Sequence, residues 1–264
     1  MNRRTIILDE IGVGPLWTRR DAAAASFDVE QPAGSGFQLE SNEAQVVSPI
    51  RNATESLGDP VNSLSLPDPD QMDFSQLRAA VANCRKCTLC EGRTRTVFGI
   101  GDEKANWLFI GEGPGRNEDA QGEPFVGPAG KLLDNMLSAI GLRRGANAYI
   151  ANIVKCRPTD ANGKDRPPTL QEAAACLPYL ERQIALIQPT LIIALGKSAA
   201  VSLLKLGPDV PVSGLRGKVH RYAGLPLVVT YHPAYLLRTP VDKKKAWADL
   251  CLAMDTHAAA TSRV

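Results

Sequence analysis

Four short apolar runs constrain the fold of this chain more than any other feature. They lie at residues 107–110, 148–154, 190–195 and 225–231, and helical patterns separate the first three. Strands that alternate with helices indicate a parallel sheet covered on both faces. We therefore predict an α/β domain whose strands end along one common edge, and open sheets of this kind bind ligands at that edge.

The helix that precedes the third run has clear signals at both ends. Thr169 is a good N-cap, Glu172 stands three residues later as in a capping box, and Pro189 follows the end of the pattern. A further helix is expected at 197–206 and a last one at 241–254. Between them, residues 210–225 are typical of a turn or a small hairpin.

Composition divides the chain into three parts. Residues 1–20 contain a compact apolar cluster, whereas residues 21–72 lose periodicity and are rich in polar and acidic side chains. Such a composition cannot bury enough apolar surface to fold. We predict a candidate docking peptide at 1–20, for which a loosely packed or cleavable start is the alternative, then a disordered acidic linker at 21–72. One folded domain is expected at 73–264, since a chain of 264 residues is short for two large domains.

Charge is distributed unevenly along the chain. Residues 1–73 carry 5 basic and 12 acidic side chains, whereas residues 74–264 carry 25 and 16. A basic domain after an acidic segment suits a polyanionic partner, although many domains are mildly basic without binding nucleic acid.

No apolar run approaches the length of a membrane span, and Asp9 and Glu10 interrupt the apolar start where a signal peptide needs a continuous core. We therefore expect a cytoplasmic protein without a membrane contact. In that reducing compartment, six cysteines are more often metal ligands or core residues than disulfides.

The loop after the first apolar run has the composition of a ligand site. Residues 111–127 read GEGPGRNEDAQGEPFVG. Its glycines let the backbone approach a ligand closely, and Glu112 and Glu118 offer two carboxylates for acid–base chemistry. The alternative is a flexible connection with surface acids.

The fourth apolar run ends in YHPAYLLR, with a proline directly after His232. The proline restrains the backbone where the strand stops, so the imidazole is expected to point into the same edge crevice. The alternative is a purely structural histidine. Leu236, Leu237 and Arg238 are expected in an exposed loop, where they suit a wedge that enters a base stack beside a phosphate.

Cysteine spacing predicts a metal site. Four thiolates hold either zinc or a four-iron four-sulfur (4Fe-4S) cluster, and the candidate ligands are Cys84, Cys87, Cys156 and Cys176. Cys90 could compete as a ligand or stay a free thiol. Cys251 lies on an apolar helix face, where a buried thiol is expected.

Four motifs, GEGPGRNED, EPFVGPAG, NIVKCRP and HPAYLLR, together with the four cysteines, resemble the family 4 uracil-DNA glycosylases, the iron-sulfur branch of that superfamily. The resemblance covers residues 74–256. It implies a three-layer αβα sandwich with a central parallel four-stranded sheet, a structural 4Fe-4S cluster, and hydrolysis of the N-glycosidic bond of deoxyuridine in DNA during base excision repair.

The resemblance also implies roles for single residues. Phe125 would stack on the flipped uracil and Asn152 would hydrogen-bond its Watson–Crick edge, while the backbone of Glu112 and Gly113 would line the pocket and leave no room for a thymine methyl group. His232 would stabilise charge on uracil O2, and Glu118 would activate the water or offset charge on the sugar. The division of labour between Glu112 and Glu118 stays open.

The resemblance implies DNA contacts as well. Leu236 and Leu237 would fill the gap left by the flipped nucleotide, with Arg238 near a phosphate. The expected partners are uracil-containing single- and double-stranded DNA, bound by a monomer. A related branch that cross-links to DNA carries a histidine before its last cysteine, and residues 163–169 contain none, so turnover is expected. A non-catalytic DNA-binding or replisome accessory protein on the same fold is the alternative.

The start of the chain resembles a different peptide. Residues 8–20, LDEIGVGPLWTRR, share the Gly, Trp and Arg-Arg order of the N-terminal peptide by which the psi subunit of some bacterial replicases docks on the clamp loader. A tryptophan beside two arginines is a typical peptide hot spot. This pattern predicts a clamp-loader or other replisome contact.

Overall fold

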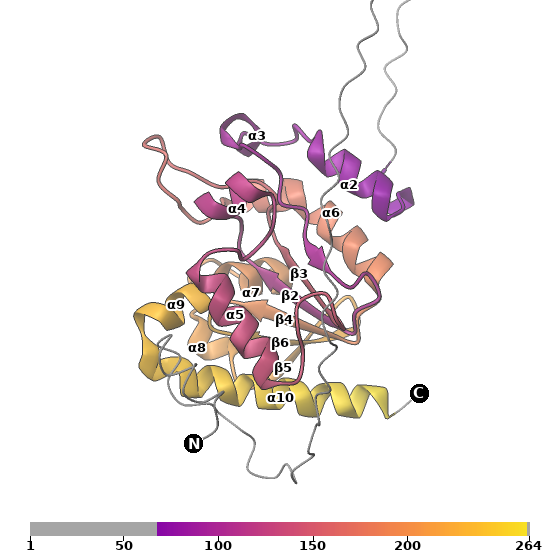
Figure 1. Cartoon of the computed structure of the whole chain (residues 1–264), viewed down its shortest axis with the longest axis vertical. Helices are drawn as coiled ribbons and strands as arrows, with labels where there is room; N and C mark the ends of the chain where they lie inside the picture. Colours follow the sequence, from indigo (N-terminus) through magenta and orange to yellow (C-terminus); the bar gives the residue numbers. More distant parts are fainter. Residues whose placement is uncertain (1–67, 263–264) are drawn as a thin grey trace, which may run out of the picture. The chain divides into compact units, whose positions relative to one another are not determined.

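The computed structural model describes residues 68–262 (Figure 1). The predicted docking peptide, and the predicted linker as far as residue 67, lie outside the described residues. None of the helices in 68–262 combines the length and the apolarity that a membrane span requires.

The centre of the domain is one mixed sheet in the order β1-β3-β2-β4-β6-β5. Its four central strands run parallel, as predicted: β2 (Trp107–Gly111), β3 (Ala148–Asn152), β4 (Leu191–Leu195) and β6 (Leu225–Thr230). The sheet has six strands rather than the four expected, because β1 (Ile100–Gly101) and β5 (Val219–Tyr222) add antiparallel edges.

The two edge strands carry weak sequence signals. Strand β1 has only two residues, and β5 is largely exposed, so neither shows an apolar pattern. The segment 210–225, expected as a turn or small hairpin, contains a short helix at 212–215 and strand β5, and β5 forms a hairpin with β6 through Ala223 and Gly224, both at positive φ as tight hairpin turns require.

Helices cover both faces of the sheet, and they begin and end as follows: α2 (Phe74–Ala82), α3 (Leu89–Gly92), α4 (Arg116–Gln121), α5 (Pro128–Ala139), α6 (Leu170–Ile187), α7 (Lys197–Leu204), α8 (Val212–Leu215), α9 (Pro233–Arg238) and α10 (Lys243–Thr261). Two short 3-10 turns complete the set, η1 (Pro69–Gln71) and η2 (Pro240–Asp242). The capping box predicted at Thr169 is confirmed, since the Thr169 hydroxyl accepts from Glu172 N at 3.2 Å and Glu172 Oε2 accepts from Thr169 N at 2.8 Å.

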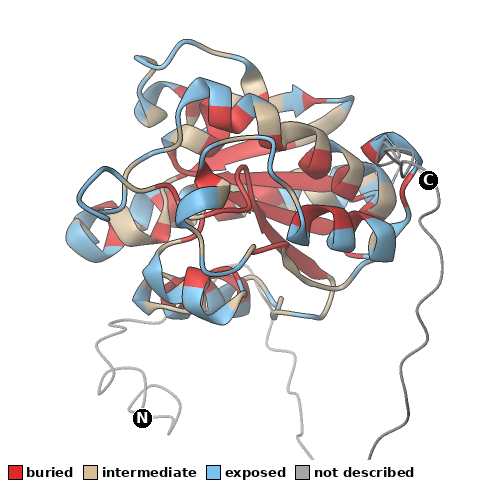
Figure 2. Ribbon diagram, turned by 90° about the horizontal axis from the view of Figure 1, so that it is seen from above, coloured by how far each residue is buried: buried red, intermediate tan, exposed pale blue. Residues whose placement is uncertain are grey.

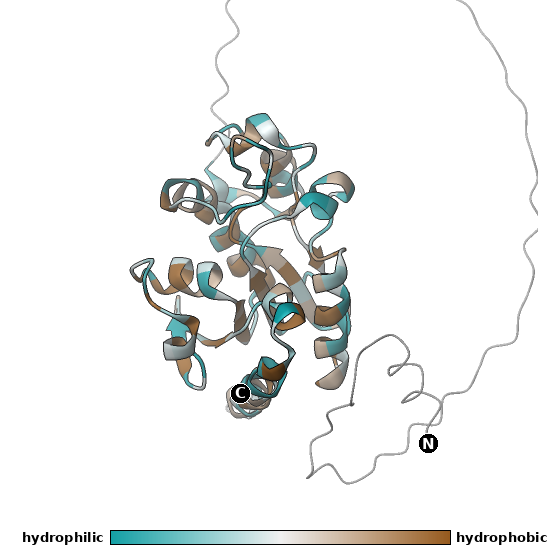
Figure 3. Cartoon of the chain, turned by 90° about the vertical axis from the view of Figure 1, so that its left-hand side faces the viewer, coloured by the Kyte–Doolittle hydropathy of each residue, from teal (hydrophilic) through white to brown (hydrophobic). Residues whose placement is uncertain are grey.

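The core has two halves because successive strand side chains point to opposite faces. In β2, Leu108 and Ile110 pack with α2, α6 and α7, whereas Trp107 and Phe109 pack on the other face with α5 and α10. Figure 2 shows the buried sheet between exposed helix faces, and Figure 3 shows the hydrophobic strands at the centre of the same layers. The three-layer αβα fold is thus confirmed.

Candidate functional site

A cleft of about 500 Å³ opens at the carboxyl edge of the central strands. This volume lies in the range of small-molecule sites. Most of the residues predicted for catalysis, base binding and DNA contact line it: Glu112, Gly113, Glu118, Phe125, Asn152, His232 and Arg238. They come from the ends of three different strands, so the parallel sheet brings distant motifs to one place.

Asn152 forms the floor of the cleft. It ends β3, pairs with Gly111 of β2 and is only 2% exposed. Its Oδ1 is buried and has no hydrogen-bond partner among the described residues. Buried polar atoms are nearly always paired in folded proteins, so an unpaired acceptor in a cleft points to a donor supplied by a ligand.

Gly111 allows the Asn152 amide and the Phe125 ring to lie close together at the floor of the cleft. A Cβ atom at this position would lie 2.4 Å from Asn152 Oδ1 and 2.7 Å from Phe125 Cζ, both far inside contact distance. Any side chain at residue 111 would therefore push the amide and the ring apart. The first glycine of the loop is needed for this close approach.

Phe125 holds its place with a strained backbone. Its φ of 56° is in the left-handed region, and its carbonyl is held by Arg144, whose Nη2 donates at 2.9 Å. A Cβ on Gly130 would lie 1.7 Å from the same carbonyl oxygen, so only glycine fits there. Such strain persists where the surroundings over-determine a conformation, often at functional sites. Arg144 was missed by the sequence analysis, because it lies in a connecting loop without a motif.

Glu118 closes the loop between α4 and α5. Its Oε1 accepts from Val126 N at 2.9 Å and from Gly127 N at 3.2 Å, and its Oε2 accepts from Gly115 N at 3.2 Å. The carboxylate thus binds both ends of the glycine-rich loop and orients the segment that carries Phe125.

Glu112, unlike Glu118, accepts a hydrogen bond from a side chain rather than from the backbone. Burial raises the pKa of this carboxyl above its usual value, and a hydrogen bond donated by Ser198 Oγ opposes the rise. Ser198 lies in the first turn of α7, directly after β4, and also escaped the sequence analysis. The two acids that the sequence left undivided are therefore distinguished by their surroundings.

His232 has a defined tautomer at the wall of the cleft. Its Nδ1 accepts from Ala234 N at 3.1 Å, so the single proton of the neutral ring is on Nε2. Burial, and then the charge of Arg238, lower the pKa of His232 to about 4, against a small opposing effect of Glu118. Its ring stacks on Phe125 with centroids 5.4 Å apart.

The segment after His232 corrects one expectation. It forms helix α9 rather than an exposed loop, because the proline occupies the first helical turn, where its missing N–H is not needed. Leu236 is 1% exposed and packs against Leu132 and Met136 of α5, whereas Leu237 is 44% exposed. The prediction that both leucines face solvent is therefore wrong for Leu236.

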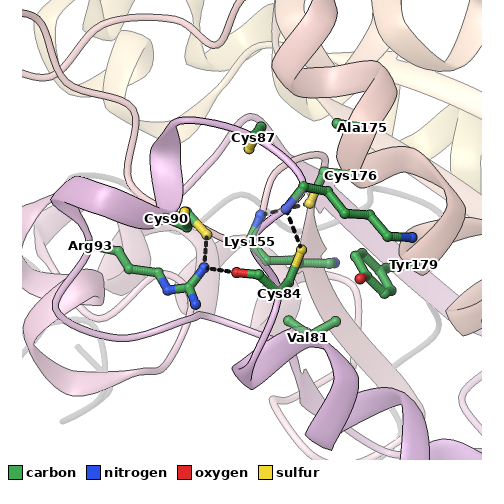
Figure 4. Close-up of a pocket in the computed structure, with 11 residues that line it drawn as sticks. Val81, Cys84, Cys87, Cys90, Arg93, Lys155, Ala175, Cys176 and Tyr179 are labelled. Carbon is green, nitrogen blue, oxygen red and sulfur yellow. Dashed lines mark hydrogen bonds between the residues drawn. The ribbon is translucent and has the colours of Figure 1, made fainter. Parts of the chain in front are cut away.

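A second pocket gathers thiols from three separate segments of the chain (Figure 4). It is lined by Cys84, Cys87, Cys90, Cys156 and Cys176, but not by Cys251, which is half-buried in α10. Within 68–262, no three His, Cys, Asp or Glu side chains are arranged to hold a single metal ion. A 4Fe-4S cluster is a larger body that needs its thiolates spread around it, so this spacing is compatible with a cluster.

Hydrogen bonds to sulfur support the same fit. Arg93 Nη1 donates to Cys156 Sγ at 3.2 Å, Lys155 N donates to Cys176 Sγ at 3.3 Å, and Lys86 N lies 3.5 Å from Cys84 Sγ. Such donors favour thiolates and tune iron-sulfur clusters. Burial raises the pKa of the Cys176 thiol to about 11, so without a bound cation this group stays protonated.

Comparisons with known proteins agree with this geometry. Residues 98–251 match the family described as the uracil DNA glycosylase superfamily. A type-4 uracil-DNA glycosylase of Pyrobaculum aerophilum is 42% identical over 187 residues, which cover 69% of this chain and 93% of that relative. Proteins of the same description from Archaeoglobus fulgidus and Thermotoga maritima are each 43% identical, over 61% and 60% of this chain and 81% and 80% of their own lengths.

A family match over more than half of the chain defines the class, and relatives more than 40% identical that are covered over 80–93% of their own lengths define the branch. The chain belongs to the type-4 uracil-DNA glycosylases.

Proposed function

We propose that this chain removes uracil from DNA by hydrolysing the N-glycosidic bond, leaving an abasic site for base excision repair. The observation that carries the proposal is the buried, unpaired Oδ1 of Asn152 at the floor of the cleft. A flipped uracil supplies the missing donor through its N3–H. Cytosine has no proton at N3 and would leave the acceptor unpaired, which costs roughly 1–3 kcal/mol.

The walls of the cleft determine which bases enter. Phe125 offers a ring face on which any flipped base can stack, so discrimination comes from Asn152 and from shape. Gly113 lines the cleft with bare backbone, and a Cβ there would lie 2.7 Å from Val154 Cγ2, so no side chain fits at this position. We infer that this tight backbone disfavours the methyl group of thymine.

His232 stabilises the departing base. As the bond from C1′ to N1 breaks, its electron pair moves onto uracil and places negative charge on O2. The neutral imidazole donates its Nε2–H toward that charge, while the N–H of Ala234 keeps Nδ1 as an acceptor. A low pKa suits this role because the ring then stays neutral across the physiological range.

Glu112 and Glu118 have different roles in the attack of water on the sugar. Glu112, with its raised pKa, is the better acceptor for the proton of the attacking water, whose oxygen adds to C1′ of the deoxyribose. Glu118 is a positioning residue that holds the Phe125 segment through three backbone N–H groups, and its negative charge offsets the positive charge that develops on the sugar.

Single- and double-stranded DNA are the substrates, and the DNA contacts follow from exposure. Leu237, rather than Leu236, is free to enter the gap in a base stack, and the exposed Arg238 beside the cleft suits a phosphate. The replisome contact predicted for residues 8–20, the monomeric state and the cytoplasmic location stay predictions.

We propose further that Cys84, Cys87, Cys156 and Cys176 hold a 4Fe-4S cluster. When bound, the cluster supplies four strong metal–thiolate links between α2, the start of α3, the segment after β3 and α6. It therefore contributes stability to the layer that carries Asn152, and no catalytic step is assigned to it.

The test is single-turnover excision on a uracil-containing oligonucleotide by the wild type and by the Asn152→Ala and Asn152→Leu variants. Both variants are expected to lose activity on the order of 10²-fold or more, because each removes the amide that reads N3–H of the base. Thr190→Val, a part-buried change just before β4 that removes the hydrogen bond from Thr190 Oγ1 to Asn106 O, is the control for folding effects, because it lies at the sheet edge opposite the cleft. Wild-type rates in either Asn152 variant would contradict the proposal.

A further inference from the structure

The thiol pocket contains one more cysteine than a 4Fe-4S cluster takes from a protein. Four cysteines ligate such a cluster, yet five line the pocket, and the fifth is Cys90. Its neighbours in the pocket include Arg93, whose guanidinium lies among the thiols (Figure 4). The presence of Cys90 in this pocket is unexplained by the function proposed above.

Chain geometry places Cys90 beside Cys87. Cys90 N donates to Cys87 O at 3.3 Å, so the two residues are one tight turn apart at the start of α3. The segment reads C-x2-C-x2-C, a spacing with which one loop presents three thiolates to a single cluster in bacterial ferredoxins. Cys90 therefore has the reach of a ligand.

Burial distinguishes the inner from the outer thiols. Cys156 and Cys176 are buried on the protein side of the pocket, whereas Cys84, Cys87 and Cys90 are half-buried on the outer side. Three outer thiols are thus available for the two remaining ligand positions. The inner thiols come from segments after β3 and within α6, and no spare thiol lies beside either of them in the part of the chain described.

Arg93 favours an anion at the outer side as well. Its Nη1 donates to Cys84 O at 2.8 Å and to Cys156 Sγ at 3.2 Å, and its Nη2 donates to Ala82 O at 3.1 Å. These bonds fix the cation between the end of α2 and the pocket, three residues after Cys90. A thiolate at any of the outer positions gains from this charge.

We propose that Cys90 is a reserve ligand that takes the place of Cys87 on the cluster. The inference rests on the proposed 4Fe-4S cluster. In the exchange the Cys90 thiol would give its proton to water and its thiolate would bind the iron, while the Cys87 thiolate that leaves the iron would take up a proton. No electron is transferred. In the intact protein Cys87 is the ligand and Cys90 is a free thiol.

The test compares iron and acid-labile sulfide in full-length protein purified without oxygen. Alanine replaces cysteine, because a serine oxygen can still bind iron. Cys87→Ala should keep at least half of the wild-type iron, whereas Cys87→Ala with Cys90→Ala should lose nearly all of it. Cys87→Ala with Cys251→Ala is the matched control and should behave as Cys87→Ala alone.

Alkylation followed by peptide mapping gives a second reading. Cys90 should react with iodoacetamide in the wild-type protein and become protected in Cys87→Ala. Loss of iron in Cys87→Ala equal to the loss in the double variant, or loss of iron in Cys90→Ala alone, would overturn the proposal. Absence of iron from the wild type would instead refute the cluster itself, so the two failures are distinguishable.

Discussion

The low pKa of His232 gives a sharp prediction about the pH dependence of base excision. A histidine in water has a pKa of 6.5, and burial together with Arg238 lowers the pKa of His232 to about 4. The direction follows from the charge, because a buried site beside an arginine disfavours the cationic ring. The neutral, donating form should therefore persist far below neutrality.

The size of the effect follows from the two pKa values. At pH 5, a ring with a pKa of about 4 is about 90% neutral, whereas one with a pKa of 6.5 is about 3% neutral. If the neutral ring is the active form, the two cases differ about 30-fold in rate at pH 5.

The assay is the single-turnover excision rate between pH 8 and pH 5 with enzyme in excess. Glu112 titrates in the same cleft with a raised pKa and adds a slope of its own. His232→Gln keeps an N–H donor that does not titrate, so the ratio of the wild-type rate to the His232→Gln rate isolates the histidine. We expect this ratio to stay constant within about twofold. A fall of about 30-fold would show that His232 titrates as in water and would refute the assignment.

Four further predictions follow from the same residues. The purified domain should be brown with about four irons, and Cys156→Ala should abolish the colour, whereas a colourless protein with one zinc would contradict the cluster. His232→Ala should lower the single-turnover rate on the order of 10²-fold while iron content stays unchanged, and a wild-type rate would refute its role. Leu237→Ala should slow excision from duplex DNA more than from single strands, and equal losses on both substrates would indicate a packing role instead. Leu236→Ala should lower the free energy of unfolding by about 2–5 kcal/mol, because it empties a packed site. Deleting residues 1–25 should leave excision from free oligonucleotides unchanged and abolish capture of clamp-loader subunits, and the docking idea fails if Trp17→Ala binds these subunits as well as wild type does.

Strand and helix periodicity sufficed to predict the central layers. The four apolar runs became β2, β3, β4 and β6 because each is buried on both faces, and such runs have no polar alternation to obscure them. The edges were not predictable in the same way. Strand β5 is exposed along most of its length, and β1 is too short for a pattern.

The residues of the site also differ in whether the sequence alone could predict them. His232 was predictable from the pattern, since it follows the fourth apolar run, whereas Asn152 lies inside the run 148–154 and was singled out only by the resemblance to a known family. Ser198 and Arg144 were not, because a serine in a helix and an arginine in a loop carry no signal until the fold brings them to Glu112 and Phe125. The burial of Leu236 also depends on tertiary packing, here against α5.

Lys155 connects the thiol pocket to the floor of the cleft through hydrogen bonds. Its backbone N donates to Cys176 Sγ at 3.3 Å, and its fully buried Nζ donates to Asn152 O at 3.0 Å and to Gln183 Oε1 at 2.6 Å. Cys176 and Gln183 both belong to α6, so one lysine ties the end of β3 to that helix twice. A buried ammonium is costly unless its partners stay in place. Loss of the thiolate links to α6 would therefore release Lys155 and, through it, the strand end that holds the Asn152 amide under Phe125.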